Sequence, residues 1–174
     1  MGDDLDDLPA RIRAGEHEAF AALVRAVAPR LVRVAARLVG DIATAEDVVQ
    51  EALVKAHAAI VAGSFAGRGR VEAWLYRIVT NGAYDARRRQ RRRPLAERVV
   101  DAPAPERLDT HLALQELAAW LDELPAAQRV ALVLSALEGL SQREIAEIQE
   151  CSEGAVEQRL VRARAALRAK EDLR

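Results

Sequence analysis

Hydrophobic residues recur at three- and four-residue spacing along most of the chain, a period typical of amphipathic helices. The first strong segment runs from Phe20 to Leu38 and contains Pro29, which either kinks one helix or separates two. Gly40 closes this segment, and Thr44 with Asp47 resembles a capping box for the next helix. Apolar runs that are rich in β-branched and aromatic residues and bounded by Gly or Pro turns are missing, so the sequence predicts an all-α protein.

The next predicted helix runs from Ala45 to about Ile60 and has one hydrophobic and one acidic face. The acidic face is either a solvated surface or a docking surface for a basic partner. A glycine-rich loop at residues 63–69 follows, and a third helical segment extends from Glu72 to about Arg89.

This third segment carries a polar stripe and ends in six arginines among the seven residues 87–93. The stripe lies along one side of a helix and consists of Trp74, Arg77, Asn81, Asp85 and Arg88. Trp74 is suited to core packing or to stacking on a base, and the Asn81 amide can donate and accept hydrogen bonds at a base edge. Because clustered guanidinium groups repel one another unless an anion binds, the segment predicts a nucleic-acid-binding surface.

Residues 94–111 are rich in proline and poor in large hydrophobic residues, which is typical of a linker. Helical spacing resumes at Leu112. Pro125 and Gly139 then bound a further helix.

The last segment predicts a helix-turn-helix. Ser141 and Glu144 form a capping box for a short helix, and Ser152 can cap a second helix after a turn at residues 149–151. The side chains that this second helix would present to a major groove are Glu153, Glu157, Gln158, Val161 and Arg162. An ordinary helical hairpin is the simpler alternative, but the caps and the cluster of arginines at 159, 162 and 164 favour DNA binding.

Composition is consistent with one ordinary domain or two small ones, because 51% of the 174 residues are hydrophobic. The net charge of −1 conceals an uneven distribution. Residues 1–93 contain 16 Lys and Arg and 12 Asp and Glu, whereas residues 112–174 contain 8 Lys and Arg and 11 Asp and Glu. The acidic N-terminus lacks the order of a signal peptide, and no hydrophobic run approaches the ~20 residues of a membrane span. We therefore expect a cytoplasmic protein without stable membrane insertion.

The sequence contains no recognisable catalytic or metal-binding constellation. His17, His57 and His111 lie on separate segments, and the single cysteine, Cys151, has no histidine near it in sequence. We expect no enzymatic activity, no catalytic residue, no metal site and no cofactor.

The two predicted surfaces together resemble those of bacterial sigma factors of the extracytoplasmic-function (ECF) type, in the sigma-70 family. The resemblance covers about Glu16 to Lys170 and rests on AEDVVQEALVKA, WLYRIVTNGAYDARRR and LPAAQRVALVLSALEGLSQREIAEIQECSEGAVEQRLVRARAAL, in that order. It implies two small all-α domains joined by a flexible linker. Their expected bounds are an acidic lead at 1–15, a three-to-four-helix sigma region 2 at 16–93, the linker at 94–111 and a helix-turn-helix sigma region 4 at 112–174.

The resemblance also implies a function and the residues that perform it. Such a factor binds the beta-prime and beta subunits of core RNA polymerase and directs promoter recognition, DNA melting and transcription initiation at a specific regulon. The residues implied in polymerase binding are Asp47, Gln50 and Glu51. Those implied at the minus-ten element, in double- and single-stranded DNA, are Ser64, Phe65, Arg68, Arg70, Trp74, Arg77, Asn81, Asp85, Arg88, Arg91 and Arg92, with Arg87 a further phosphate contact. Those implied at the minus-thirty-five element are Ser141, Glu153, Glu157, Gln158, Arg159, Val161 and Arg162.

The chain departs from the family pattern in its helix-turn-helix. Glu157 replaces a common cation, and Glu150 stands where a glycine often makes the turn, so we expect a slightly strained turn. The resemblance further implies an anti-sigma factor as a partner, which could hold the protein at the membrane. A stand-alone helix-turn-helix regulator is the main alternative, although it gives residues 65–93 no role.

Overall fold

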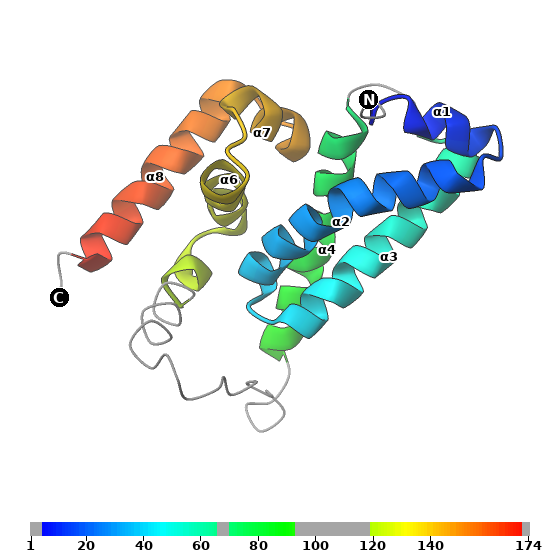
Figure 1. Ribbon diagram of the computed structural model, residues 1–174. Coiled ribbons are helices and arrows are strands. Elements are labelled where there is room, and N and C mark those ends of the chain that lie inside the picture. Colours follow the sequence, from blue (N-terminus) through cyan, green and yellow to red (C-terminus); the bar gives the residue numbers. More distant parts are fainter. Residues whose placement is uncertain (1–4, 66–69, 93–118, 172–174) are drawn as a thin grey trace.

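The computed structural model describes residues 5–65, 70–92 and 119–171, and within these ranges every regular element is a helix. The helices form two neighbouring groups (Figure 1). The N-terminal group contains α1 (Leu8–Arg13), α2 (His17–Val39), α3 (Ile42–Val61) and α4 (Val71–Arg92). The C-terminal group contains a short helical segment at 119–123, then α6 (Ala126–Leu137), α7 (Gln142–Gln149) and α8 (Glu153–Glu171). The predicted all-α fold is confirmed; the expected linker at 94–111 lies outside the described residues.

The first strong hydrophobic segment forms one helix, because α2 runs through Pro29 without a break. Leu23, Val27 and Leu31 are buried on its inner face, against α3 and α4. Gly40 ends the helix in the left-handed conformation, at φ 80°, where glycine is favoured because a side chain would crowd the backbone.

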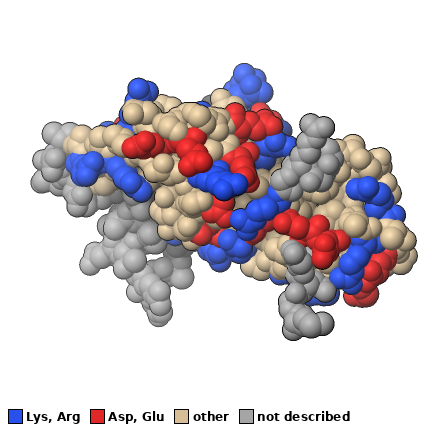
Figure 2. All heavy atoms as spheres, turned by 90° about the horizontal axis from the view of Figure 1, so that it is seen from above, with Lys and Arg blue, Asp and Glu red and all other residues tan. Residues whose placement is uncertain are grey.

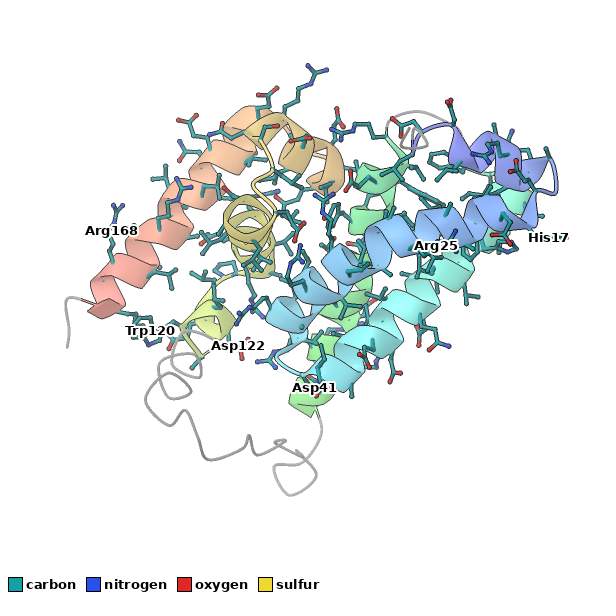
Figure 3. The ribbon with its side chains drawn as sticks, in the orientation of Figure 1. His17, Arg25, Asp41, Trp120, Asp122 and Arg168 are labelled. Atoms are coloured by element: carbon teal, nitrogen blue, oxygen red, sulfur yellow. The ribbon has the colours of Figure 1, made fainter. Side chains whose placement is uncertain are left out.

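The start of α3 differs from the sequence prediction. The capping residue is Asp41 (Figure 3), whose carboxylate accepts a hydrogen bond from the Thr44 amide at 2.7 Å. The predicted capping box of Thr44 with Asp47 was therefore wrong. The physical reason is that Asp41 has the extended backbone of a capping residue, at φ −146° and ψ 131°, whereas Thr44 already lies inside the helix.

The expected acidic lead contains a short helix that the sequence pattern did not reveal. Leu8 and Ile12 of α1 are 1% and 5% exposed because they complete the core formed by α2 and α3. Asp6 is also structural, since its Oδ1 accepts a hydrogen bond from the amide of Val71 at the start of α4, at 2.9 Å. This carboxylate satisfies one of the amides that the first turn of a helix leaves without a partner.

The C-terminal group has the predicted helix-turn-helix geometry. Ser141 and Glu144 form a reciprocal capping box at the start of α7, and Ser152 accepts a hydrogen bond from the Ala155 amide at the start of α8. Between them Glu150 adopts φ 48° and is the one non-glycine residue with positive φ among the described residues. The strained turn expected at this position is thus confirmed.

The two groups share one hydrophobic core. Val133 and Leu134 of α6 and Ile145 of α7 belong to the same buried cluster as the core residues of α2, α3 and α4. Helix α6 packs against α2, and α7 packs against α4. The DNA-binding surfaces predicted on α4 and in the helix-turn-helix therefore belong to elements that are in contact.

Replacing Asp41 with Ala removes the cap of α3, and we expect it to destabilise the chain by about 1 kcal/mol. For a chain of this length that corresponds to a midpoint of thermal unfolding lowered by about 2–4 °C. The control is Glu46→Ala, at an exposed position of the same helix, for which a change within about 0.5 kcal/mol is expected. Equal effects of the two substitutions in thermal unfolding followed by circular dichroism would contradict the capping role.

Candidate functional site

The residues predicted to bind polymerase lie together on the outer face of α3. Asp47, Gln50 and Glu51 are all exposed, and Glu51 forms an ion pair with Lys55 at 3.7 Å. Both partners of that pair are about two-thirds exposed, so solvent screens it and the acidic face remains available to a partner.

A groove with hydrophobic walls runs beside this acidic face. Its volume is about 580 Å³, and it lies between α2 and α3 with Phe20, Leu53 and Val54 among its lining residues. Val54 is 65% exposed, and Gln50 lies at the groove as well. The predicted polymerase face thus combines acidic side chains with an exposed hydrophobic surface.

The residues predicted at the minus-ten element fall into an inner and an outer set. Phe65 is 8% exposed, and its ring contacts that of the half-buried Trp74 with centroids 4.5 Å apart. Ser64 is exposed, and its hydroxyl donates to the Ala59 carbonyl at 3.0 Å. In this conformation the two aromatic rings support the start of α4, and Arg68 lies outside the described residues.

The outer part of the α4 stripe faces solvent. Asn81, Asp85, Arg88 and Arg92 are exposed, and Arg88 lies 3.8 Å from the Asp85 carboxylate; the side chain of Arg91 lies outside the described residues. The two arginines nearer the start of α4 lie against α7. Arg70 Nη1 donates to Glu144 Oε1 at 2.6 Å, and Arg77 pairs with Glu150.

The recognition helix α8 exposes most of its predicted DNA contacts. Glu153, Glu157, Gln158, Val161 and Arg162 are exposed, as is Ser141 at the start of α7. Arg159 instead lies half-buried and donates hydrogen bonds to Gln149 Oε1 at 2.7 Å and to Cys151 Sγ at 3.1 Å. It therefore braces the turn between the two helices.

A buried carboxylate at the junction of the two helical groups was missed from sequence. The side chain of Glu138, at the end of α6, is 1% exposed. Three groups donate hydrogen bonds to it: Arg30 at 2.8 Å, Arg33 at 2.9 Å and the Tyr76 hydroxyl at 3.0 Å. These four residues are named the Glu138 cluster. Its partners lie 62 to 108 residues from Glu138, so no local motif could have revealed it.

The environment of the Glu138 cluster shifts the pKa values of its members. Burial alone would raise the pKa of the Glu138 carboxyl, but the hydrogen bonds from the two arginines and Tyr76 outweigh it, and the pKa is lowered. Burial, together with the bond to Glu138, raises the pKa of the Tyr76 hydroxyl, which therefore remains a donor. Glu72 also faces the cluster and pairs with Arg30.

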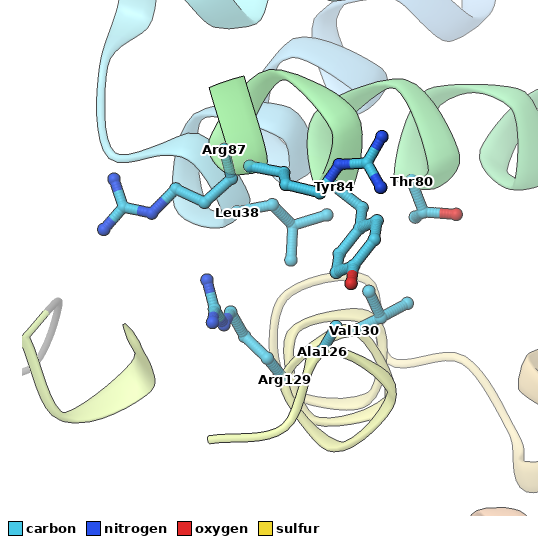
Figure 4. A pocket seen from close by; sticks show the side chains of 8 residues that line it. Leu38, Thr80, Tyr84, Arg87, Ala126, Arg129 and Val130 are labelled. Carbon is cyan, nitrogen blue, oxygen red and sulfur yellow. The ribbon is translucent and has the colours of Figure 1, made fainter. Parts of the chain in front are cut away.

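Arg87, expected to be a phosphate contact, has partners within the protein. It donates to the Val39 carbonyl at the end of α2 at 2.7 Å and pairs with Asp122, which also lies 3.1 Å from Arg129. Figure 4 shows Arg87 and Arg129 beside a small cavity of about 110 Å³ between α4 and α6. Arg87 thus helps to hold the short segment at 119–123 near α4.

Acidic and basic side chains are interspersed through the middle of the face shown in Figure 2, rather than gathered into one basic patch. None of the described helices is long and hydrophobic enough to cross a membrane. Over the same residues, no group of three or more His, Cys, Asp or Glu side chains could hold a metal ion.

The described residues form a helical protein with a helix-turn-helix in its C-terminal group. The family model of sigma-70 region 2 matches residues 23–93, and that of sigma-70 region 4 matches residues 114–167. The ECF RNA polymerase sigma-E factor of Escherichia coli K12 is 35% identical, with 96% of this chain and 95% of that protein covered. The RNA polymerase sigma-H factor of Pseudomonas aeruginosa is 33% identical, with 92% and 90% covered. The chain belongs to the sigma-70 family and, within it, to the ECF sigma factors.

Two solved structures are similar to this chain over most of its length. CnrH, in complex with the cytosolic domain of CnrY, has a TM-score of 0.78 at 32% identity and covers 98% of this chain and 99% of its own. The sigma factor RpoE from Bartonella quintana, in complex with the anti-sigma factor NepR, has a TM-score of 0.67 at 32% identity and covers 87% and 96%.

Glu138→Gln keeps the shape of the side chain and removes its charge. Because the pKa of Glu138 is lowered in the folded protein, the carboxylate stabilises the fold above its ordinary pKa of ~4.3, and this is lost as pH falls through the lowered value. We expect the substitution to reduce the free energy of unfolding at pH 7 by about 1.5 kcal/mol, the lower end for hydrogen bonds to charged groups. The lower end applies because Arg30 and Arg33 are 37% and 54% exposed.

The difference between wild type and Glu138→Gln should shrink when denaturant unfolding is repeated below about pH 4. Glu147→Gln, at an exposed site of α7, is the control for loss of one carboxylate. A difference that stays constant from pH 7 to pH 3.5 would contradict the charged state of Glu138 in the folded protein.

Proposed function

We propose that this chain performs its sigma-factor function through three surfaces, one on each of α3, α4 and α8. It binds core RNA polymerase, recognises a set of promoters, opens their DNA and so starts transcription. The main support is that both sigma regions match this chain, in the family's order. The contact residues predicted on the three helices are also mostly exposed.

The acidic face of α3 is the proposed docking surface for polymerase. Asp47 and Glu51 offer negative charge to a basic partner, and the groove beside them offers a hydrophobic surface. Charged groups at such a surface steer association, while the buried hydrophobic contact supplies the affinity.

The stripe of α4 is the proposed surface for the minus-ten strand. Asn81 is exposed and can hydrogen-bond to a base edge, and Arg88 and Arg92 can bind phosphates beside it. Unpairing a base costs a few kcal/mol, which stacking and phosphate contacts offset. Strand opening by differential binding requires no nucleophile, so we propose that the chain has no enzymatic activity of its own.

The recognition helix α8 is the proposed surface for the minus-thirty-five element. Gln158 and Arg162 can reach base edges or phosphates, and Glu157 can accept a hydrogen bond from a cytosine amino group. Arg159 holds the turn that sets the angle of this helix, through Gln149 and Cys151.

We further propose an anti-sigma factor as a regulatory partner of the chain in the cytoplasm. The support is the similarity, across nearly the whole chain, to CnrH bound to the cytosolic domain of CnrY and to RpoE bound to the anti-sigma factor NepR.

Two substitutions separate polymerase binding from DNA opening. Asp47→Arg reverses a charge on α3, and we expect it to weaken binding to core polymerase about tenfold, or ~1.4 kcal/mol, in a fluorescence binding assay. Asn81→Ala should leave that binding unchanged but reduce strand opening by about tenfold or more, since a lost base contact costs about 1–3 kcal/mol. Opening is measured with permanganate on promoter fragments bound by the holoenzyme.

The matched controls are exposed residues of α2 outside the proposed surfaces. Glu18→Arg is the control for charge reversal, and Arg25→Ala (Figure 3) is the control for truncation. Specific duplex binding by the chain without any initiation by the holoenzyme would instead favour the stand-alone regulator.

A further inference from the structure

The segment before α2 lies outside the part of the chain that matches sigma region 2, which begins at residue 23. It is nevertheless fixed in the N-terminal group. Leu8 and Ile12 of α1 are buried in the core, and Arg11 donates hydrogen bonds to both carboxylate oxygens of Glu16 at the start of α2, at 2.8 and 2.5 Å. The packing of α1 against α2 and α3 therefore determines where the residues just before α1 lie.

One of those residues, Asp6, reaches the start of α4 (Figure 1). Its Oδ1 accepts a hydrogen bond from the Val71 amide at 2.9 Å, across 65 positions of the chain. The residue directly before α4 cannot offer this contact. The Arg70 carbonyl accepts a hydrogen bond from the Trp74 amide, but the Arg70 side chain contains only donors. An amide in the first turn of α4 thus takes its acceptor from a distant segment.

The start of α4 carries residues that are predicted to contact the minus-ten element. Arg70 is exposed there, and Trp74, one turn further on, packs against Phe65 with ring centroids 4.5 Å apart. Phe65 belongs to the segment that follows α3, so the aromatic contact joins two parts of the predicted surface. A shift of the first turn of α4 would change the spacing between Phe65 and the two residues of the helix.

Asp6 is not suited to contact DNA itself, because a carboxylate repels phosphate. The pKa of Arg70 is raised by its hydrogen bond to Glu144 first, and by the charges of Glu144, Glu72 and Asp6 after it. Asp6 therefore lies within electrostatic reach of a predicted phosphate contact, where an acid is unfavourable for DNA binding. Its bond to Val71, and the favourable dipole at the start of a helix, give it a different role.

We propose that Asp6 is a positioning residue for recognition of the minus-ten strand. It fixes the first turn of α4, so that Phe65, Arg70 and Trp74 keep the spacing in which they meet the DNA. The proposal rests on the proposed assignment of α4 to minus-ten DNA. Asp6 and Val71 both belong to the N-terminal group, so their contact does not depend on where α6, α7 and α8 lie. A segment outside the matched sigma region thus contributes to promoter opening without touching DNA.

Hydrogen exchange of the free chain, followed by NMR, tests whether Asp6 fixes the first turn of α4. We expect Asp6→Ala to speed exchange of the Val71 amide at least about fivefold, because the amide loses its acceptor. Asp6→Asn keeps an acceptor oxygen and should stay within about twofold of wild type. Asp7→Ala is the control, since the neighbouring Asp7 forms no capping hydrogen bond with its side chain.

Strand opening by the holoenzyme tests whether this position matters for function. On promoter fragments that the wild-type holoenzyme opens, we expect Asp6→Ala to lower permanganate reactivity in the minus-ten element at least about fivefold, with binding to core polymerase unchanged. Asp6→Asn should restore most of the reactivity, because its side-chain oxygen can still accept from Val71.

The matched control is Asp41→Ala, which removes the cap of another helix in the same group and should leave opening unchanged. Loss of one cap lowers the midpoint of thermal unfolding by about 2–4 °C and leaves the chain folded at 25 °C. A purely structural role of Asp6 would therefore leave opening at 25 °C unchanged in both variants.

Unchanged exchange of the Val71 amide in Asp6→Ala would overturn the proposal, as would full opening by that variant. Equal losses of opening in Asp6→Ala and Asp41→Ala would also overturn it, because the effect would then follow stability. These outcomes leave the proposed function intact. A wild-type holoenzyme that opens no promoter would instead refute the proposed function, and the positioning role of Asp6 with it.

Discussion

Burial of the Glu138 carboxylate constrains how the two helical groups pack. A buried charge is unfavourable unless it is paired and hydrogen-bonded, and here two arginines and a tyrosine hydroxyl provide the donors. Glu138 also follows the last residue of α6, where the helix dipole disfavours a negative charge. The carboxylate is therefore tolerable only with α2 and α4 in place, and its hydrogen bonds add to the hydrophobic contacts that hold α6 in the shared core.

Helix α4 has three roles in this arrangement. Its inner residues, such as Leu75 and Val79, are fully buried in the core. Its exposed stripe, with Asn81 and Arg88, is the proposed surface for DNA, and its Arg77 contacts α7. Arg77 is also predicted to contact the minus-ten strand. It cannot bind a carboxylate and a phosphate at once in the same geometry, so the predicted DNA contact would compete with the pair to Glu150. The proposed function thus uses a side chain that already has a partner in the described part of the chain.

Local sequence patterns predicted most of the secondary structure and the helix-turn-helix. These patterns act within a few residues, so they can be recognised from the sequence. They are the helical spacing, the capping box of Ser141 and Glu144, and the glycine at position 40. Helix α1 escaped prediction because it has only two large buried hydrophobic residues, Leu8 and Ile12, amid charged neighbours. The Glu138 cluster escaped because its partners are distant in sequence and meet only after folding.

The role of Glu150 could be predicted only in part from the sequence. Its unfavourable turn was evident from sequence, because a residue with a Cβ stood where glycine is suited, but its partner Arg77 lies 73 residues away. The strain costs roughly 1–2 kcal/mol, whereas an ion pair exposed at the surface contributes about 0–1 kcal/mol, so the contact does not repay the strain as stability. Stability therefore does not account for a residue with a Cβ at this position. At this position the side chain brings a carboxylate to an arginine that is proposed to bind promoter DNA.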